Sequence, residues 1–514
     1  MRAIVFVICA VGTALAACST DENDSSSAAG GSAGAAGAAG SPTAGAGGTN
    51  AGGTSTGGMG GGSNTGGTST GGTGGGSNTG GASTGGMGGG SNTGGASTGG
   101  MGGGSNTGGT GGGSTASTCE PMPPPTGATT LVTPAMTGQL QSLIFNASPH
   151  ETFVFASGTY ALEGAYLWVR APGVTLRSES GNPEDVVLDG GYQSSEIVTI
   201  AASDVTIAEL SIRRAFTHPI HVTGSDTGPT VNTRIYRVFI TDPREQAIKI
   251  NPSSNPVHFA DDGEIACSRI VMTDAGRGHV SDCYTGGVDA HQARGWLLRD
   301  NEIEGFWCES GLAEHAIHFW RGCRDTMVER NVLVDNARGV GLGMATSGSA
   351  RTYPDNPCPA AGGAYVDHYG GIVRNNFIVG KRPELFSSQD GFDTGIGLWS
   401  ACNAVAVHNT IVATNSLFSA IEWRFSTSTG IRILNNLATH ALRERDGASA
   451  ESQGNIDNAA LSQFEDVAAA NLHLKAGSSA IDHGVSVGPG LCAEDIDGDL
   501  RDATPDVGAD ERLP

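Results

Sequence analysis

The chain has 514 residues, with 28 Lys and Arg against 51 Asp and Glu, and a formal net charge of −23 at pH 7. An acidic chain without a basic patch excludes nucleic acid as a partner, and it repels polyanions unless a local basic groove overrides the average charge. Gly accounts for 82 residues, and their uneven distribution divides the chain into three parts.

Residues 1–17 are typical of a secretory leader, with the charged Arg2, the apolar run 4–11 and the small-residue site Leu15-Ala16-Ala17-Cys18. This part resembles the bacterial lipoprotein signal, in which cleavage precedes Cys18 and the thiol takes a lipid. In that family Ser19 after the Cys favours the outer membrane. The resemblance therefore implies an exported protein that is lipid-anchored to the outer membrane at the cell surface. An ordinary secretory signal with a chance Cys is the alternative.

Residues 18–118 contain mostly Gly, Ser, Thr, Ala and Asn, with a fourteen-residue repeat that starts at Gly52, Gly66, Gly80 and Gly94. Such a segment has almost nothing to bury and predicts a disordered tether behind Cys18. A Gly-rich coil of this length has an r.m.s. span on the order of 50 to 60 Å. A glycine-rich β-structured repeat is the alternative.

Residues 119–514 form the predicted folded domain. The stretch 138–144 is a short amphipathic helix candidate, and 152–160 reads as a first strand and turn. Regular strands follow from Val174 onward.

One short phrase recurs seven times further along: a small or polar residue, Ile or Val, a variable residue and an apolar residue. The copies are Pro219-Ile220-His221-Val222, Ala247-Ile248-Lys249-Ile250, Gly287-Val288-Asp289-Ala290, Ala316-Ile317-His318-Phe319, Gly339-Val340-Gly341-Leu342, Gly395-Ile396-Gly397-Leu398 and Ala420-Ile421-Glu422-Trp423. Because side chains alternate between faces along a strand, the variable residue points outward and its apolar neighbours point into a core. The unequal intervals between copies suit a solenoid with loops of different length, and two long intervals need insertions.

A second register lies between these phrases, where an apolar strand ends in Asn. The Asn residues are Asn301, Asn331, Asn376, Asn409 and Asn436. In this respect residues 127–514 resemble the pectate-lyase-like right-handed parallel β-helix family. The resemblance implies an all-β fold of three-stranded coils with an Asn ladder at one turn and a short N-terminal capping helix. A leucine-rich repeat is the structural rival, but its Leu consensus is missing.

The end of the chain, with 472–475, 480–482, 495–501 and 506–511, resembles the closing segment of bacterial surface β-helix proteins. Within it Asp495, Asp497 and Asp499 are candidate Ca²⁺ ligands, although the EF-hand order of Gly and Glu is absent. Calcium is thus the only cofactor that the sequence suggests.

Eight cysteines remain in the predicted domain, an even number in an exported chain, so we expect disulfides. Connectivity does not follow from sequence, but Cys267 with Cys283 and Cys308 with Cys323 would each close a loop beside one coil. A metal cluster is the alternative, and no CxxC pair supports it.

The candidate functional residues lie in two outward columns. The first contains His221, Lys249, Asp289, His318, Gly341, Gly397 and Glu422; the second, two residues further along each strand, contains Thr223, Asn251, His291, Trp320, Gly343, Trp399 and Arg424. Neighbouring strands lie about 4.8 Å apart, so Lys249, Asp289 and His318 are predicted within two coil steps. The two Trp suit stacking on sugar rings, and the two Gly of the first column predict a hollow for a glycan chain. The family that the chain resembles carries its glycan groove on the outer face of one sheet.

These residue types favour a polysaccharide lyase. Elimination at a uronate needs a base and a group that neutralises the carboxylate. The predicted catalytic residues are Lys249, Asp289, His291, His318 and Arg321, with Lys249, His291 or His318 as base and Arg321 or Arg424 as neutraliser. The predicted substrate-binding residues are Asn251, Trp320, Trp399, Glu422 and Arg424.

A glycosidase needs two carboxyl groups about 5 to 9.5 Å apart, and Asp289 and Glu422 are four copies, or roughly 19 Å, apart. Glu309 and Glu314 are alternative partners for Asp289. The family's own calcium aspartates and catalytic arginine have no matching motif here. A non-catalytic glycan-binding or adhesive surface protein is the rival hypothesis, and a glycosidase or epimerase on the same scaffold is a third.

Overall fold

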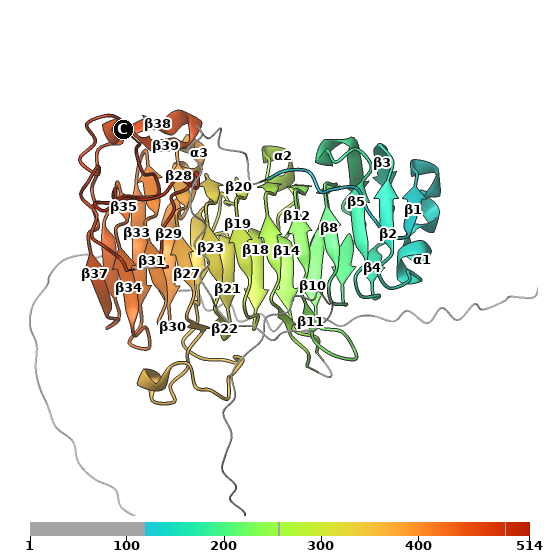
Figure 1. Ribbon diagram of the computed structural model, residues 1–514, viewed down its shortest axis with the longest axis horizontal. Helices are drawn as coiled ribbons and strands as arrows, with labels where there is room; N and C mark the ends of the chain where they lie inside the picture. Colours follow the sequence, from blue (N-terminus) through green and yellow to red (C-terminus); the bar gives the residue numbers. More distant parts are fainter. Residues whose placement is uncertain (1–118, 255–256, 489, 514) are drawn as a thin grey trace, which may run out of the picture. The chain divides into compact units, whose positions relative to one another are not determined.

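The computed structural model describes residues 119–254, 257–488 and 490–513. The predicted leader 1–17 and tether 18–118, with the lipidation site Cys18, lie outside the described residues. In the described part the chain winds through three parallel sheets in turn and forms a right-handed parallel β-helix (Figure 1). Right-handed crossovers are the rule for parallel strands, because a right-twisted strand packs back onto its sheet in that sense.

Sheet A has the strands β1 (Thr129–Val132), β2 (Thr152–Phe155), β5 (Thr175–Ser178), β8 (Thr206–Ala208), β12 (Arg234–Tyr236), β16 (Glu264–Ala266), β19 (Leu297–Arg299), β23 (Met327–Glu329), β27 (Ile372–Arg374), β31 (Val405–Val407), β34 (Ile431–Leu434) and β37 (Ala450–Gln453). Sheet B has the strands β3 (Gly158–Ala161), β6 (Val186–Asp189), β9 (Ser211–Arg213), β13 (Phe239–Thr241), β17 (Arg269–Val271), β20 (Glu302–Glu304), β24 (Val332–Val334), β28 (Phe377–Gly380), β32 (Thr410–Ala413) and β35 (Leu437–Ala438). Sheet C has the strands β4 (Leu167–Val169), β7 (Val198–Ile200), β10 (Ile220–Thr223), β14 (Gln246–Asn251), β18 (Gly286–His291), β21 (His315–Trp320), β25 (Arg338–Leu342), β29 (Phe392–Trp399), β33 (Leu417–Arg424) and β36 (Leu442–Arg445).

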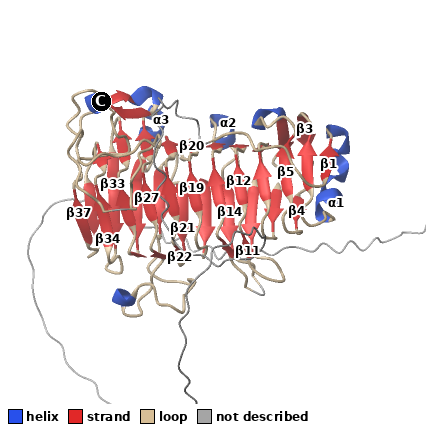
Figure 2. Cartoon of the chain, in the orientation of Figure 1, coloured by secondary structure: helices blue, strands red, loops and turns tan. Residues whose placement is uncertain are grey.

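Shorter elements lie at the margins of these sheets (Figure 2). They are the strand pair β11 (Thr230–Val231) and β15 (Ala260–Asp261), the triplet β22 (Cys323–Arg324), β26 (His368–Tyr369) and β30 (Ala401–Cys402), and the antiparallel pair β38 (Phe464–Asp466) and β39 (Asn471–Leu474). The α-helices are α1 (Leu140–Phe145), α2 (Asp274–Arg277) and α3 (Pro383–Ser387). No helix in the described ranges is long and apolar enough to span a bilayer.

The hydrophobic core lies between the three sheets. The apolar residues of the recurring phrase are the side chains of sheet C that face this core. The Ile/Val positions of the seven copies are all fully buried: Ile220, Ile248, Val288, Ile317, Val340, Ile396 and Ile421. The small first residue of the phrase has a steric cause. A Cβ on Gly287 would lie 2.3 Å from the carbonyl oxygen of Ala316 and 2.9 Å from a methyl of Ile303, so the coils meet too closely there for a larger residue.

The predicted Asn ladder is confirmed at the turn between sheets A and B. Each Asn donates from Nδ2 to Oδ1 of the Asn in the next coil, over distances of 2.9 to 3.0 Å. Its rungs are Asn301, Asn331, Asn376, Asn409, Asn436 and Asn455. The same Oδ1 atoms also accept the backbone N–H of the preceding Asn. Buried polar groups are stabilising only when they are fully paired, and the interior rungs satisfy this condition.

The helix predicted over 138–144 is present as α1, one residue later than expected at its C-terminal end. Its Leu140 and Ile144 are fully buried and join the core, and the helix lies beside β4 at the β1 end of the stack (Figure 1).

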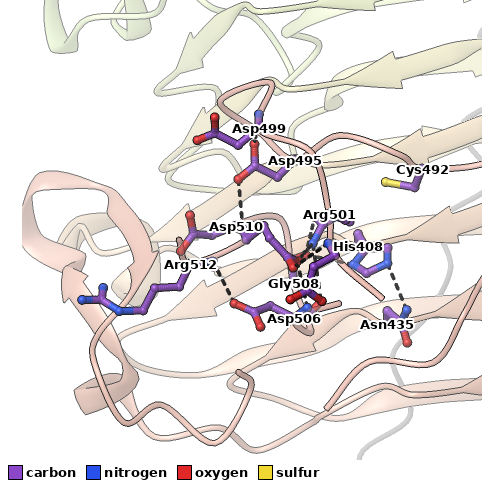
Figure 3. A network of polar contacts seen from close by, with 12 residues as sticks. His408, Asn435, Cys492, Asp495, Asp499, Arg501, Asp506, Gly508, Asp510 and Arg512 are labelled. Carbon is purple, nitrogen blue, oxygen red and sulfur yellow. Dashed lines mark hydrogen bonds and ion pairs between the residues drawn. The ribbon is translucent and has the colours of Figure 1, made fainter. Parts of the chain in front are cut away.

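The closing segment packs along the outer face of sheet B. Val507 and Ala509, together with Leu472 and Leu474 of β39, form a small apolar cluster with outward side chains of β24, β28 and β32. Arg501, 3% exposed as a side chain, pairs with Glu511 at 3.1 Å and donates to the Gly508 carbonyl at 3.0 Å (Figure 3).

His408 joins this segment to the coils. Its Nδ1 lies 3.2 Å from the Gly508 carbonyl oxygen, and its Nε2 accepts from Asn435 Nδ2 at 2.9 Å (Figure 3). Burial lowers the pKa of His408 to about 3, and the nearby Arg501 adds to the effect. The folded chain therefore keeps this ring neutral over the whole range in which a histidine in the unfolded chain takes up a proton.

Among the cysteines from Cys119 onward, which the structure describes, three disulfides form: Cys119–Cys267, Cys283–Cys308 and Cys358–Cys402. Disulfides were expected, but neither of the two pairings considered from sequence forms. Cys323 is the reason in one case, because it points into the core and its thiol contacts the Ala290 carbonyl at 3.4 Å. Cys283 and Cys308 instead join the two loops that precede β18 and β21.

We expect Asn376→Ala to destabilise the fold by about 3 kcal/mol, because it leaves several buried backbone and side-chain groups unpaired, each costing about 1 to 3 kcal/mol. Asn376 donates to Asn409 Oδ1 and to the carbonyls of Val328 and Arg374. The midpoint of chemical denaturation measures the change. The control is Asn455→Ala at the partly exposed last rung, for which we expect a clearly smaller loss. Equal losses at both rungs would contradict a stabilising ladder.

His408 predicts a pH dependence of stability. Its folded pKa is depressed relative to the ordinary value of 6.5, so the unfolded chain binds one more proton as the pH falls. This contribution to stability is complete above pH 6.5 and is lost as the pH falls toward the folded pKa, by at most about 1.4 kcal/mol per pH unit.

Denaturation midpoints at neutral pH and at about pH 4.5 test this prediction. The decrease in stability between the two pH values should be smaller in His408→Gln than in the parent chain, by the contribution of one bound proton. The exposed His483→Gln is the control and should keep the parent slope. An unchanged slope in His408→Gln would refute the assignment.

Candidate functional site

The seven recurring phrases form seven neighbouring strands of sheet C, from β10 to β33. The backbone register pairs His221 with Lys249, Lys249 with Asp289, and Asp289 with His318. It continues through Gly341 and Gly397 to Glu422. The two long intervals therefore contain loops and no extra coil, and the predicted outward columns exist.

Asp289 is the centre of a buried polar cluster. Its Oδ2 accepts a hydrogen bond from Lys249 Nζ at 2.5 Å and lies 3.2 Å from His291 Nε2. Its Oδ1 accepts from the indole N–H of Trp320 at 2.9 Å. Lys249 is 6% exposed and Asp289 is 3% exposed, so the ion pair is removed from water. The three adjacent strands β14, β18 and β21 bring these side chains together.

The two charges of this pair stabilise each other. Burial acts to lower the pKa of Lys249, but the Asp289 carboxylate and the Tyr284 hydroxyl more than offset it and hold that pKa above its ordinary value. Burial likewise acts to raise the pKa of Asp289, and Lys249 and His291 hold it well below its ordinary value. At neutral pH the pair is an ammonium and a carboxylate, so Lys249 carries no free lone pair.

His291 is the titratable group of the cluster that remains neutral and partly accessible. Burial and the Lys249 charge lower its pKa below 6.5, and 16% of its side chain is exposed. Tyr284, which is 37% exposed, approaches from the loop before β18, with its hydroxyl 3.3 Å from Lys249 Nζ. The Cys283–Cys308 disulfide fixes this loop next to Tyr284.

Trp320 organises the accessible edge of the cluster. The His291 ring meets it edge-on, with centroids 4.8 Å apart, and the Arg321 guanidinium carbon lies 4.6 Å from its ring centroid. Among the described residues no hydrogen-bond acceptor or carboxylate pairs with the Arg321 guanidinium, and its Nε is buried. The cluster thus places a neutral base and an uncommitted cation against the same indole.

His318, a predicted catalytic residue, lies beneath this edge. It is fully buried, and its ring is stacked on Trp320 at 5.1 Å. Its Nδ1 is 3.6 Å from Asp289 Oδ1 and 3.5 Å from Glu314 Oε2. No polymer can reach His318 in this arrangement, so its predicted contact with substrate lacks structural support.

The hollow predicted at the two Gly positions is absent, because neighbouring side chains cover them. The His315 ring occupies the space above Gly341, where an added Cβ would lie 2.7 Å from Nε2. Trp399 covers Gly397 in the same way, with ring atoms 3.0 Å from an added Cβ. Glycine here serves internal packing and provides no approach for a glycan chain.

Three of the predicted substrate-binding residues lie apart from the cluster. Trp399 is 5% exposed and packs beside His315 with ring centroids 5.5 Å apart. Glu422 is 1% exposed and pairs with Arg445 at 3.1 Å, and Arg424 pairs with Asp446. Their predicted roles stay predictions, but their side chains are already committed to partners within the fold.

Asn251 belongs to a second network beside the cluster. Its Oδ1 lies 2.5 Å from His221 Nε2, and His221 Nδ1 lies 2.7 Å from Glu196 Oε1. Burial acts to raise the pKa of Glu196, but His221 lowers it to about 2. Glu196 is therefore ionised and holds His221 toward Asn251.

The candidate calcium ligands are arranged differently from a metal loop. Both carboxylate oxygens of Asp495 accept backbone N–H groups, from Asp497 and Asp499 on one oxygen and from Glu511 on the other. Asp497 Oδ2 instead lies 2.8 Å from His473 Nε2. Calcium binding here stays a prediction, and Asp495 as arranged stabilises the closing segment (Figure 3).

Two surface hollows lie elsewhere on the molecule. One of about 630 Å³ is lined by Asp335, Lys381, Arg382, Glu384, Thr414, Val467 and Ala468. One of about 430 Å³ is lined by Asp262, Arg294, Gly295, Arg324, Asp325, Tyr353, Pro354 and Asp355. Neither includes a residue of the Asp289 cluster.

No protein-family model and no curated protein matches the chain. Solved structures to which it is similar include an alginate lyase from Paenibacillus sp. str. FPU-7 (TM-score 0.41, 14% identity, 64% of this chain and 99% of that chain). Others are the pectate lyase Pel9A (TM-score 0.41, 13% identity, 76% and 97%) and PfbA, a surface adhesin of Streptococcus pneumoniae (TM-score 0.35, 10% identity, 63% and 85%). At these scores the similarity identifies none of the site residues.

Sequence reasoning missed Tyr284, which belongs to the Asp289 cluster, and His315, which lies next to His318. Tyr284 lies in a loop, outside the repeated phrase that defined the columns. His315 is the first residue of β21 and precedes the phrase, but the local sequence Glu314-His315-Ala316-Ile317-His318 holds two closely spaced histidines beside a carboxylate. This spacing of two histidines and a carboxylate was the sequence signal that could have identified His315.

Proposed function

We propose that the outer face of sheet C binds a uronate-containing polysaccharide and cleaves it by β-elimination. The observation that carries this proposal is that a neutral, partly exposed His291 and the uncommitted guanidinium of Arg321 both lie against the same indole, that of Trp320. Two solved structures to which the fold is similar are an alginate lyase and a pectate lyase, which agrees with this substrate class.

His291 is the base that the geometry supports best among the three candidates. Lys249 is held as an ammonium by Asp289, and His318 is fully buried. His291 Nε2 lies 3.2 Å from Asp289 Oδ2 and 3.4 Å from Lys249 Nζ. In the tautomer that we propose, Nε2 carries the proton and donates it to Asp289 Oδ2, and Nδ1 is unprotonated. The Asp289 carboxylate then stabilises the imidazolium that forms when Nδ1 takes a proton, and Lys249 keeps Asp289 in place.

Arg321 is the neutraliser that the geometry supports, because Arg424 already pairs with Asp446. A guanidinium beside the uronate carboxylate lowers the cost of the negative charge that develops when the neighbouring C–H bond breaks. The net charge of −23 opposes the approach of a polyanion, but exposed charges beyond about 8 Å are largely screened at physiological salt. Arg321 acts within that distance.

Tyr284 completes the reaction as proton donor. Burial raises the pKa of its hydroxyl, so the group is protonated at neutral pH. His291 removes the proton from the carbon beside the carboxylate, the C–H electrons form the ring double bond, and the glycosidic C–O bond breaks. The leaving oxygen takes the Tyr284 proton. The products are a new chain end and an unsaturated uronate.

A glycosidase has less support at this site. It needs one carboxyl group whose raised pKa makes it a proton donor. For Glu314 burial acts to raise the pKa, but His318 and Arg338 lower it below its ordinary value. Asp289 is lowered as well, so this pair offers two carboxylates and no acid.

A non-catalytic glycan-binding protein is the second candidate function. The observation that favours it is the buried Lys249–Asp289 ion pair, which is a structural use of two predicted catalytic residues. In that case Trp320 and Arg321 would contact sugar without any reaction.

Incubation of the chain with a panel of uronate polysaccharides, followed by ultraviolet absorbance of the unsaturated product, tests the lyase. We expect His291→Ala to lower the rate by about 10²-fold or more, as for loss of a general base. Because His291 acts as a base when neutral and its pKa is lowered from the ordinary value of 6.5, the rate should still be level at pH 6.5 and should fall only at lower pH.

Arg321→Gln should raise KM and lower kcat/KM on the same substrate, whereas the exposed His483→Ala should leave both unchanged. Reducing ends without ultraviolet absorbance would indicate a hydrolase instead. Retained binding with neither product would favour the adhesive function, and equal rates in His291→Ala and the parent would refute the assigned base.

We further propose an exported lipoprotein anchored at Cys18. Three disulfides support an oxidising compartment, and the lipid site itself lies outside the described residues. Cys18→Ala should abolish incorporation of labelled fatty acid and move the chain from the detergent phase to the aqueous phase. Unchanged partitioning of the variant would contradict the anchor.

A further inference from the structure

A group of metal-ligating atoms without partners lies beside the Asp289 cluster. Glu314, His315 and His318 each offer one ligand atom, and these atoms all lie within 4.8 Å of one another. His315 and His318 are fully buried. Both ring nitrogens of each histidine and Glu314 Oε2 are buried without a hydrogen-bond partner. Buried polar atoms without partners are rare in native proteins, so these atoms are candidates to bind a ligand.

The fold aims these atoms at one another. Ala316 and Ile317, between the two histidines, both face the interior, so His315 and His318 leave the same outer face of β21. Their ring centroids lie 4.4 Å apart. Gly341 of the next strand makes room for His315, since an added Cβ would lie 2.7 Å from its Nε2.

The spacing suits a metal better than a hydrogen bond. His318 Nδ1 and Glu314 Oε2 are 3.5 Å apart, which is longer than a hydrogen bond between such atoms. Zn²⁺ binds His nitrogen and carboxylate oxygen at about 2.0 to 2.2 Å, and a tetrahedron of that size has edges of about 3.4 Å. The pair therefore matches two ligands of one ion.

We propose that Glu314, His315 and His318 bind a divalent transition metal, Zn²⁺ in the first instance. Two histidines and one carboxylate form a ligand set that zinc sites use, with a fourth position left open. The Glu314 side chain is 22% exposed and provides the entry path. Trp320 and Trp399 line the histidines and exclude water. This site is independent of the proposed elimination, in which none of the three residues takes part.

Metal content of the purified full chain tests the proposal. After chelator treatment, dialysis against dilute ZnCl₂ and removal of free metal, His315→Gln should contain one zinc equivalent fewer than the parent. Gly341→Ala should lose the same equivalent, because its methyl displaces the His315 ring. Glu314→Gln should weaken binding by about tenfold or more. His440→Gln, a partly buried histidine outside the group, is the control and should keep the parent content.

Co²⁺ in place of Zn²⁺ gives a readout of coordination. We expect visible absorption typical of tetrahedral cobalt in the parent and His440→Gln, and its loss in His315→Gln. Circular dichroism and melting of the metal-free proteins show whether each variant folds. If His315→Gln does not fold, the metal content of Gly341→Ala and the effect of chelator on the melting temperature of the parent test the proposal instead. Equal metal content in the parent and a folded His315→Gln, or no metal in the parent, would overturn the proposal.

Discussion

The parallel register between successive coils is the constraint on which the rest of the structure depends. Each strand of sheets A, B and C pairs residue by residue with its neighbours one coil before and one coil after. Once this register is set, like positions stack into columns at the strand spacing of about 4.8 Å. The core, the Asn ladder and the Asp289 cluster are all columns of this kind. A shift of one residue would turn every inward side chain outward, which is why the fully buried Ile and Val positions hold the register so firmly.

Stacking in register brings polar and charged side chains of successive coils close together, so their charges must be balanced by neighbouring residues. On the outer face of sheet C the column brings Lys249 against Asp289 and Asp289 against His318. Loops then cover this face and remove the ion pair from water, so each charge depends on its partner. Under this cover the ammonium and the carboxylate stay ionised, whereas the His291 ring stays neutral. The division into a fixed ion pair and one accessible base arises because His291, in the second column, is less buried than Lys249 and Asp289 in the first.

The two halves of the outer face of sheet C differ in whether their polar side chains reach the surface. Between β14 and β21 polar side chains reach the surface at Tyr284, His291 and Arg321. Beyond β21 the same columns are closed by His315, Trp399 and the Glu422–Arg445 pair. A glycan ligand of the face is therefore expected over the first half, whereas the buried histidines of β21 at the boundary are closed to a polymer. The three disulfides hold loops and the entry segment against the coils at the edges of this arrangement.

The amino-acid sequence by itself determined the three-strand coil, the inward Ile and Val, the Asn ladder and the membership of the outward columns. All of these follow from a local alternation of side chains that is repeated from coil to coil. It did not determine that Gly341 lies under His315, that Lys249 is locked to Asp289, or that His318 is sealed from solvent. Nor did it determine which cysteines pair. Only the tertiary structure decided these points, because they depend on side-chain directions and on loops from distant parts of the chain. The register places residues in a column. The packing around the column decides whether each side chain pairs with a polar group, packs against a neighbouring ring or is exposed to water.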